Sequence, residues 1–207
     1  MERQQLTVPL PPDIREKVQV RHGDFTALNR RWSTSRSNTI HARLQEDPSE
    51  WYLYHTLYRE ARESWPEQPF ERIADRIRVR PDWVVGDFGC GECLLSKALP
   101  DNRVIGLDHV GWDESVIECD ISDTPLDDAS LDVAVFSLSL MGTNWTNYLQ
   151  EAYRTLKPYG HLFIAEPQSR WKGRAEELEG AIQAVGFSVV SRLEQRYDFL
   201  YLTAVKV

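Results

Sequence analysis

The most constraining feature of this sequence is residues 84–93, where a short apolar run ends in Asp-Phe-Gly-Cys-Gly. The apolar residues suit a strand that is buried on both faces of a parallel sheet. Gly89 and Gly91 permit a tight turn after this strand, which would bring backbone N–H groups close to a ligand. The stretch therefore predicts a cofactor loop, although two glycines after a strand also fit an ordinary turn.

Acidic residues end this apolar run and the two that follow it. Asp87 ends the first, Asp108 ends the second 21 residues later, and Asp120 ends the third. A doubly wound sheet uses a carboxylate at the tip of its second strand, ~20 residues further on, to accept hydrogen bonds from ribose hydroxyls. Leu94 occupies the third glycine position of the dinucleotide fingerprint. The pattern therefore favours a nucleoside ligand without phosphates, such as S-adenosylmethionine.

The chain from Trp83 onward alternates between strand and helix patterns, which predicts an α/β fold with a parallel sheet. No crossover helix separates the last two strands, so we expect a hairpin around residues 194–197 and one antiparallel strand. This is the seven-stranded, Rossmann-like sheet of class I methyltransferases. Strands are expected near residues 83–88, 103–108, 116–119, 131–138, 160–166, 187–193 and 198–206, and helices near 92–99, 145–156 and 173–185.

The N-terminal part predicts an arm over residues 1–44 and a helical cap over 45–82, before a core over 83–207. The proline-rich residues 1–13 should be extended, and residues 21–38 should form a short helix with a mobile tail. Asp47 is a predicted N-cap, and Glu50 is placed to complete a capping box, for a helix that ends near residue 65. A second helix, from about Pro69 to Pro81, should direct its arginines mostly outward.

Composition limits the class of protein and its partners. The 207 residues, 42% of them hydrophobic, fit one domain with an elaboration at one end. The longest apolar stretch, residues 131–142, is too short to span a bilayer, and no signal sequence opens the chain. We therefore expect an intracellular protein without a membrane partner. Cys90 and Cys93 have no second Cys/His pair at ligand spacing, which argues against a zinc site.

Charge is divided unevenly along the chain. Residues 1–44 carry a net charge of +4 and residues 45–207 a net charge of −12. The basic field that RNA phosphates require is therefore offered only by the N-terminal arginines, although a solvated arm explains them equally well. These arginines are Arg21, Arg30, Arg31, Arg36 and Arg43.

From Phe25 to the C-terminus the chain resembles the nucleomethylin family, ribosomal-RNA-processing methyltransferases that methylate N1 of an adenine in large-subunit rRNA. Several motifs are much more specific than a glycine loop. They include Leu-Gln-Glu-Asp-Pro at 44–48, Trp-Pro-x-Gln-Pro at 65–69, Asp-Phe-Gly-Cys-Gly at 87–91, Ser-Leu-Ser-Leu-Met-Gly-Thr-Asn at 137–144 and Leu-Lys-Pro at 156–158.

The resemblance implies S-adenosylmethionine as the cofactor and a set of residues that line its pocket. Asp108 would accept from the ribose hydroxyls, Asp120 would accept from the adenine amino group, and Ile121 would pack on the ring. Asp87 would organise the loop and the methionine ammonium. For His55, an ordinary helix histidine is the alternative. The full predicted set is His55, Asp87, Gly89, Gly91, Asp108, Asp120, Ile121 and Ser137.

Three functions remain open at this point. The first is methylation of adenine N1 in structured ribosomal RNA, in the cytoplasm or, in a eukaryote, the nucleus or nucleolus. The second is methylation of a small molecule or peptide, and the third is a cofactor-responsive binding or scaffold protein. No catalytic residue is assigned, because attack by N1 of an unpaired adenine needs no general base. Met141, Asn144, Trp145 and Glu166 follow the fourth and fifth strands, where they could contact an acceptor or pack the loops.

Overall fold

A computed structural model describes residues 6–207, apart from the side chains of residues 192–195. The chain forms two compact units. The helical unit contains residues 6–66 together with Met141–Thr143, and the sheet unit contains Glu67–Leu140 and Asn144–Val207. This division differs from the expected boundaries, because residues 67–82 group with the sheet.

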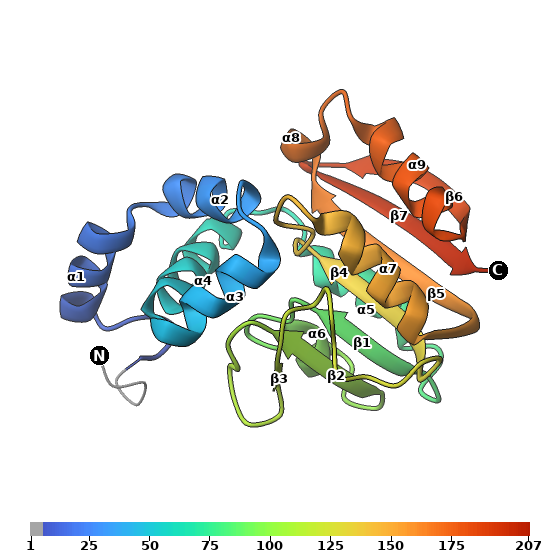
Figure 1. Cartoon of the computed structure of the whole chain (residues 1–207), viewed down its shortest axis with the longest axis horizontal. Helices are drawn as coiled ribbons and strands as arrows, with labels where there is room; N and C mark the ends of the chain where they lie inside the picture. The colour runs from blue at the N-terminus through green and yellow to red at the C-terminus, as the bar shows by residue number, and fades with distance from the viewer. Residues whose placement is uncertain (1–5) are drawn as a thin grey trace. The chain divides into compact units, whose positions relative to one another are not determined.

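The helical unit contains more regular structure than the sequence predicts. Its helices are α1 (Pro12–His22), α2 (Phe25–Ser33), α3 (Ser37–Glu46) and α4 (Ser49–Arg62) (Figure 1). Residues 6–11 have no helix or strand, as expected, and the short helix expected within residues 21–38 is α2, whereas the sequence does not predict α1 and α3. Each of these three helices buries apolar side chains, and this burial stabilises turns whose polar sequence would not be helical alone. The buried residues are Val18, Leu28, Trp32, Ile40 and Leu44.

The start of α4 agrees with its sequence signal only in part. Asp47 lies before the helix, and its Oδ1 accepts hydrogen bonds from the backbone N of Ser49 at 3.2 Å and from Ser49 Oγ at 2.7 Å. The predicted capping box is wrong, because the Glu50 side chain turns into the unit and is only 1% exposed.

The Glu50 carboxylate is the centre of a buried polar cluster that joins four helices. Its Oε1 accepts from Trp32 Nε1 at 2.7 Å and pairs with Arg31 and Arg43 at 3.0 Å each. Oε2 lies 3.4 Å from Nδ1 of His22. Because these cations and donors compensate the buried charge, Glu50 serves helix packing rather than helix capping.

The sheet unit contains the predicted seven-stranded sheet, in the order β3-β2-β1-β4-β5-β7-β6. Only β7 is antiparallel to its neighbours, since β5 and β6 both pair with it in that sense. The predicted hairpin is confirmed, with its turn at residues 197–198. The strands are β1 (Val84–Phe88), β2 (Arg103–Asp108), β3 (Ile117–Glu118), β4 (Leu131–Ser137), β5 (Leu156–Pro167), β6 (Phe187–Arg196) and β7 (Phe199–Lys206).

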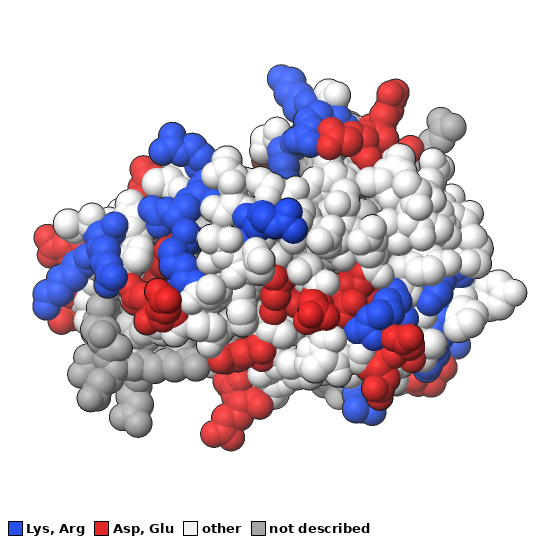
Figure 2. Space-filling model, viewed as in Figure 1, with Lys and Arg blue, Asp and Glu red and all other residues white. Residues whose placement is uncertain are grey.

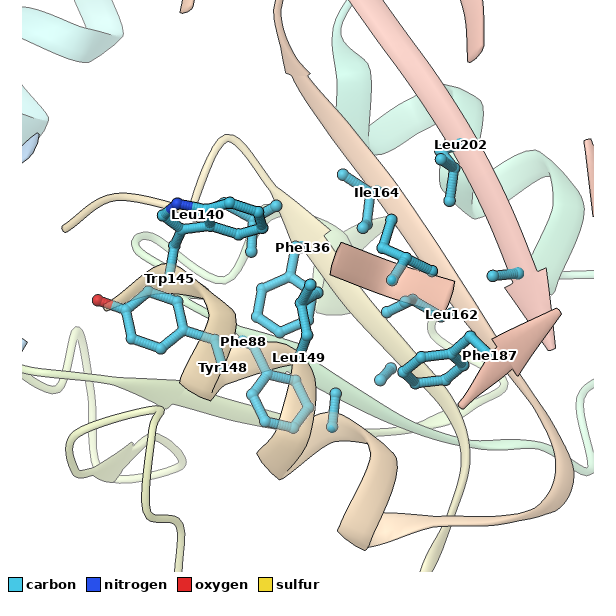
Figure 3. Packing of buried hydrophobic residues seen from close by; sticks show 14 of the residues in the cluster. Phe88, Phe136, Leu140, Trp145, Tyr148, Leu149, Leu162, Ile164, Phe187 and Leu202 are labelled. Atoms are coloured by element: carbon cyan, nitrogen blue, oxygen red, sulfur yellow. The ribbon is translucent and has the colours of Figure 1, made fainter. Parts of the chain in front are cut away.

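Helices cover both faces of this sheet. α7 (Trp145–Thr155) and α9 (Ala175–Val185) lie on one face, and α5 (Pro69–Ile77) and α6 (Leu94–Ala98) lie on the other (Figure 1). A fully buried core fills the α7 side, where the Phe88 and Phe136 rings lie 5.1 Å apart beneath Leu149 (Figure 3). In the described part of the chain, every helix is too short or too polar to cross a bilayer.

Two local features of the sheet unit are not predicted by the sequence. The fifth strand, expected from residue 160, begins at Leu156, and a short helix, α8 (Gln168–Trp171), follows that strand. The arginines of residues 72–80 are mostly exposed, as predicted, but two of them also contact β7. The Arg72 guanidinium lies 4.8 Å from the Tyr201 ring, and Arg76 donates to Thr203 Oγ1 at 3.0 Å. Their long side chains reach β7 because α5 lies along the sheet.

Candidate cofactor site

Backbone hydrogen bonds fasten together the carboxyl ends of β1, β2 and β3. The N–H groups of Gly89 and Cys90 both donate to the Leu107 carbonyl, at 2.8 and 3.0 Å. On the other side of β2, the Cys119 N–H donates to the Asp108 carbonyl at 2.8 Å. The three acidic strand ends predicted from the sequence therefore lie along one edge of the sheet, where α/β folds bind their ligands.

The glycine loop uses its N–H groups differently from the expectation. Besides the two bonds to Leu107, the Gly91 N–H donates to Asp108 Oδ2 at 2.8 Å. These three N–H groups therefore donate to acceptors at the end of β2. The prediction that the loop directs its N–H groups at a ligand is wrong for these three. A loop with its donors occupied is poorly suited to phosphate, which agrees with the preference for a nucleoside without phosphates.

Gly89 is required by a close contact with the loop after β4. It has φ of +82°, and a Cβ atom placed on it would lie 2.5 Å from the Cβ atom of Ser139. The Ser139 hydroxyl beside it is buried and has no hydrogen-bond partner among the described residues. Ser139 was not among the predicted site residues, because sequence spacing does not show which serine of the 137–144 run faces the glycine.

Asp108 orients the loop through both of its carboxylate oxygens. The residue is 7% exposed. Oδ2 accepts from Gly91 and Oδ1 accepts from the His109 N–H, both at 2.8 Å. A carboxylate at the end of the second strand is the group that accepts hydrogen bonds from ribose hydroxyls in such sheets, so the ribose contact of Asp108 stays a prediction.

Asp87 is a buried carboxylate whose charge is not compensated like that of Glu50. It lies in β1 opposite Gly106 and Val135 and is 3% exposed. Burial, with a smaller contribution from the negative charge of Asp108, raises the pKa of Asp87 to about 7. A cation bound beside Asp87 would favour its charged form, so this edge of the sheet is suited to a positively charged ligand.

The remaining residues of this edge have mixed outcomes. Asp120 accepts from the Ser122 N–H at 2.9 Å, and Ile121 is 5% exposed and belongs to the hydrophobic core. The contacts of these two residues with adenine stay predictions. Ser137 ends β4 opposite Ala165 of β5.

The loop after Ser137 is fastened by a buried acid. The Leu140 N–H donates to Glu166 Oε1 at 2.9 Å, and Trp171 Nε1 lies 3.5 Å from Oε2. Burial raises the pKa of Glu166, which is 1% exposed. Of the two roles open for Glu166, acceptor contact or loop packing, these bonds support loop packing.

His55 is the one predicted pocket residue that belongs to the helical unit. Its ring lies 4.0 Å from that of Trp51 and meets the rings of Tyr54 and Tyr58 edge-on. The other seven candidates belong to the sheet unit. The pocket role of His55 therefore stays a prediction.

The three cysteines are free thiols and buried. The pKa of the Cys90 thiol lies well above its ordinary value. The largest cause is a hydrogen bond with Cys93, and the next is burial. Within the described residues no three His, Cys, Asp or Glu side chains are grouped to hold a metal ion. Cys90 instead packs against β2, because a Cβ on Gly106 would lie 3.0 Å from its sulfur atom.

Comparisons with known proteins identify relatives of this chain. The chain is 41% identical over 179 residues to ribosomal RNA-processing protein 8 of Rattus norvegicus, which covers 86% of this chain and 39% of the rat protein. It is 35% identical over 167 residues to the 25S rRNA (adenine(645)-N(1))-methyltransferase of Schizosaccharomyces pombe, covering 75% of this chain and 52% of that protein. The chain thus spans about half or less of these two relatives.

Solved structures support the fold. The chain resembles a 1,6-didemethyltoxoflavin-N1-methyltransferase of Burkholderia thailandensis with a TM-score of 0.61 at 20% identity, covering 84% of this chain and 91% of that one. It also resembles a TehB-like methyltransferase of Corynebacterium glutamicum with a TM-score of 0.60 at 15% identity, covering 78% and 100%. Residues 12–207 match the family described as hypothetical methyltransferase, and the chain belongs to that family.

Proposed function

We propose that this chain is an S-adenosylmethionine-dependent methyltransferase that methylates N1 of an adenine in ribosomal RNA. The observation that carries the cofactor assignment is the bond from Gly91 to Asp108, which closes the loop beside the buried Asp87. This arrangement places two carboxylates, and no free loop donors among residues 89–91, at the ligand-binding edge. Such an edge favours a cation with ribose hydroxyls over a nucleotide phosphate.

Each predicted residue has a distinct task in this proposal. Asp108 accepts from the ribose hydroxyls, and Asp87 pairs with the methionine ammonium. Asp120 accepts from the adenine amino group while Ile121 borders the ring. Gly89 and Gly91 let the loop pass close to the ligand without a side chain. His55 and Ser137 complete the pocket.

Bound S-adenosylmethionine would supply an electrophilic methyl group. An acceptor lone pair would form the new bond to that carbon as the carbon–sulfur bond breaks, with S-adenosylhomocysteine as the leaving group. The chain must therefore hold the acceptor in line and exclude water, and it needs no covalent nucleophile. N1 of an unpaired adenine has no proton to lose, so no general base is needed either. This agrees with Glu166, whose carboxylate is occupied with the loop after β4.

Ribosomal RNA as the acceptor is supported by the named activity of the Schizosaccharomyces pombe relative and by the helical unit. Figure 2 shows Lys and Arg side chains gathered over α1 to α3 of that unit. Arg31 and Arg43 are tied to Glu50, and Arg21 pairs with Asp47 at 2.8 Å. The exposed Arg30 and Arg36 are therefore the first candidates for phosphate contacts. An rRNA substrate places the protein inside the cell, in the nucleolus if its source is a eukaryote.

Nucleoside mass spectrometry after incubation with S-adenosylmethionine tests this proposal. The protein is incubated in parallel with total RNA and with a metabolite extract, and an Asp108→Ala variant serves as the inactive reference. We expect 1-methyladenosine in the digest of RNA treated with the wild-type chain and none in the digest of RNA treated with Asp108→Ala. Methylated product only in the metabolite extract would replace RNA with a small-molecule acceptor. Tight cofactor binding without product in either pool would support a cofactor-responsive binding protein instead.

A further inference from the structure

Residues Met141–Thr143 follow the end of β4 in sequence but belong to the helical unit. Two contacts hold them there. The Thr143 N–H donates to the carbonyl of Ser35 at 2.9 Å, just after α2. The Tyr54 hydroxyl of α4 lies 3.7 Å from Sδ of Met141. The helical unit therefore holds the second half of the loop formed by residues 138–144.

The first half of this loop is held by the sheet unit. The Leu138 N–H donates to the Ala165 carbonyl at 2.8 Å, and the Leu140 N–H donates to Glu166. Leu138 and Gly142 have φ of +61° and +106°. A left-handed backbone costs roughly 1–2 kcal/mol at a residue such as leucine, so the surrounding bonds must keep the loop in this conformation.

Tyr54 is itself a rigid anchor. Its ring stacks on Trp32 at 4.4 Å and contacts Phe25 at 5.2 Å. Its hydroxyl also lies 3.4 Å from Oδ1 of Asn29, whose Nδ2 donates to the Phe25 carbonyl at 2.8 Å. A tyrosine fixed on both ring and hydroxyl loses little entropy when it holds the flexible Met141 side chain.

We propose that Tyr54 and the Ser35 carbonyl are positioning groups that set the loop 138–144 for the methyl acceptor. The loop leaves the carboxyl end of β4, which is the edge where ligands bind in such sheets. It begins beside Ser137, a predicted pocket residue, and includes Ser139 at the glycine loop. In this proposal, the contacts of Met141–Thr143 within the helical unit fix the second half of the loop. This inference rests on the proposed methyl transfer.

Amide hydrogen exchange of residues 139–144 tests the anchoring directly. Tyr54→Phe removes the hydroxyl and keeps the ring stack, whereas Met141→Ala removes the partner on the loop. A matched control is Tyr52→Phe, which removes the hydroxyl of a buried tyrosine of the same helix that makes no hydrogen bond to the loop among the described residues. We expect loop exchange to rise about threefold in Tyr54→Phe and about tenfold in Met141→Ala, with no change in Tyr52→Phe.

Turnover separates positioning from a merely structural role. We expect both loop variants to lower kcat for RNA methylation, about threefold in Tyr54→Phe and about tenfold in Met141→Ala, and to leave the Kd for S-adenosylhomocysteine within about twofold. In the double variant the loss should be smaller than the product of the two single losses, because both variants break one contact.

Several outcomes would overturn the inference. Unchanged loop exchange in Met141→Ala would show that the helical unit does not hold the loop. Faster exchange with unchanged kcat would show that the loop does not place the acceptor. A wild-type chain that methylates no RNA would instead contradict the proposed function, and the same kcat comparison would then be made with the acceptor found in the metabolite extract.

Discussion

Glu50 of the helical unit and Asp87 of the sheet unit are buried carboxylates in opposite environments. In the helical unit, burial alone would raise the pKa of Glu50, but bonds from His22 and Trp32 and the charges of Arg43 and Arg31 hold it at about 2. In the sheet unit, burial raises the pKa of Asp87 to about 7, and its acidic neighbour Asp108 adds to the increase. Glu50 is thus a compensated charge and Asp87 an uncompensated one.

From this difference we infer that Glu50 serves the fold and that Asp87 serves a ligand. Because the folded-state pKa of Glu50 is depressed, its stabilisation is present above the ordinary value of 4.5 and is lost as pH falls toward 2. Because the pKa of Asp87 is raised, the protein without cofactor loses stability as pH rises from about 4 to about 7. A group that stays costly at neutral pH is explained by a ligand that compensates it.

Removal of Glu50 should give the largest effect. Glu50→Ala leaves Arg31, Arg43 and His22 clustered without their counter-charge, so we expect a loss of about 3–5 kcal/mol in the helical unit. Urea denaturation followed by far-ultraviolet circular dichroism measures it. The matched control is Glu60→Ala, which breaks an exposed pair with Arg15 at 3.0 Å and should cost at most about 1 kcal/mol. Equal losses of stability in the two variants would show that the buried Glu50 cluster stabilises the unit no more than an exposed ion pair.

Removal of the Asp108 carboxylate should weaken cofactor binding and leave the stability of the helical unit unchanged. Asp108→Ala loses the bonds to Gly91 and His109 as well as the expected ribose contact. We expect roughly 100-fold weaker binding of S-adenosylhomocysteine in titration calorimetry. Asp101→Ala, an exposed carboxylate just before β2, should bind normally. Normal affinity in Asp108→Ala would show that the pocket is wrongly assigned.

A methyl group on Gly89 should disturb the site through the backbone. Gly89→Ala meets both the positive φ and the Ser139 side chain, so we expect a loss of about 2 kcal/mol or more in thermal unfolding. Gly180→Ala is the matched control, because its Cβ in α9 meets nothing within 4 Å. That variant should be neutral or more stable by up to about 1 kcal/mol. Additional Ser139→Gly should recover part of the Gly89→Ala loss.

The smallest effect concerns the exposed arginines of the helical unit. Replacing Arg30 and Arg36 by Gln should weaken RNA binding several-fold and reduce the slope of log affinity against log salt by about 1 per arginine. Arg78→Gln, in the sheet unit, should leave the slope unchanged. The slope is measured by fluorescence anisotropy at several salt concentrations. An unchanged slope in the double variant would move the RNA contact away from these arginines.

The sequence predicts the sheet well because its signals are local. Apolar runs that end in Asp87, Asp108 and Ser137 are strands in the structure, and the missing crossover helix correctly predicts the reversed β7. Because parallel strands end at the same edge of a sheet, the positions of the acids in the sequence are enough to place them together. Boundaries are less accurate, since β5 begins at Leu156 by continuing directly from α7.

Tertiary partners explain what the sequence does not predict. Glu50 has the spacing of a capping box, but four side chains from three other helices draw it into the unit. The helices α1 to α3 have polar sequences and depend on that packing. Ser139 becomes a candidate for the site only because it lies against Gly89. Most of these contacts join residues well separated in the chain, such as Trp32 with Glu50 and Gly89 with Ser139, where periodicity carries no signal.

The most direct test of the uncompensated Asp87 is the pH dependence of cofactor affinity. With a pKa of about 7 in the protein alone, Asp87 must lose its proton to pair with the ammonium of S-adenosylhomocysteine. Titration calorimetry should therefore show about tenfold tighter binding at pH 8 than at pH 6 in the wild-type chain. Asp87→Asn should bind more weakly at both pH values and show no such increase. An equal increase in the variant would contradict the account, because the proton would then belong to another group.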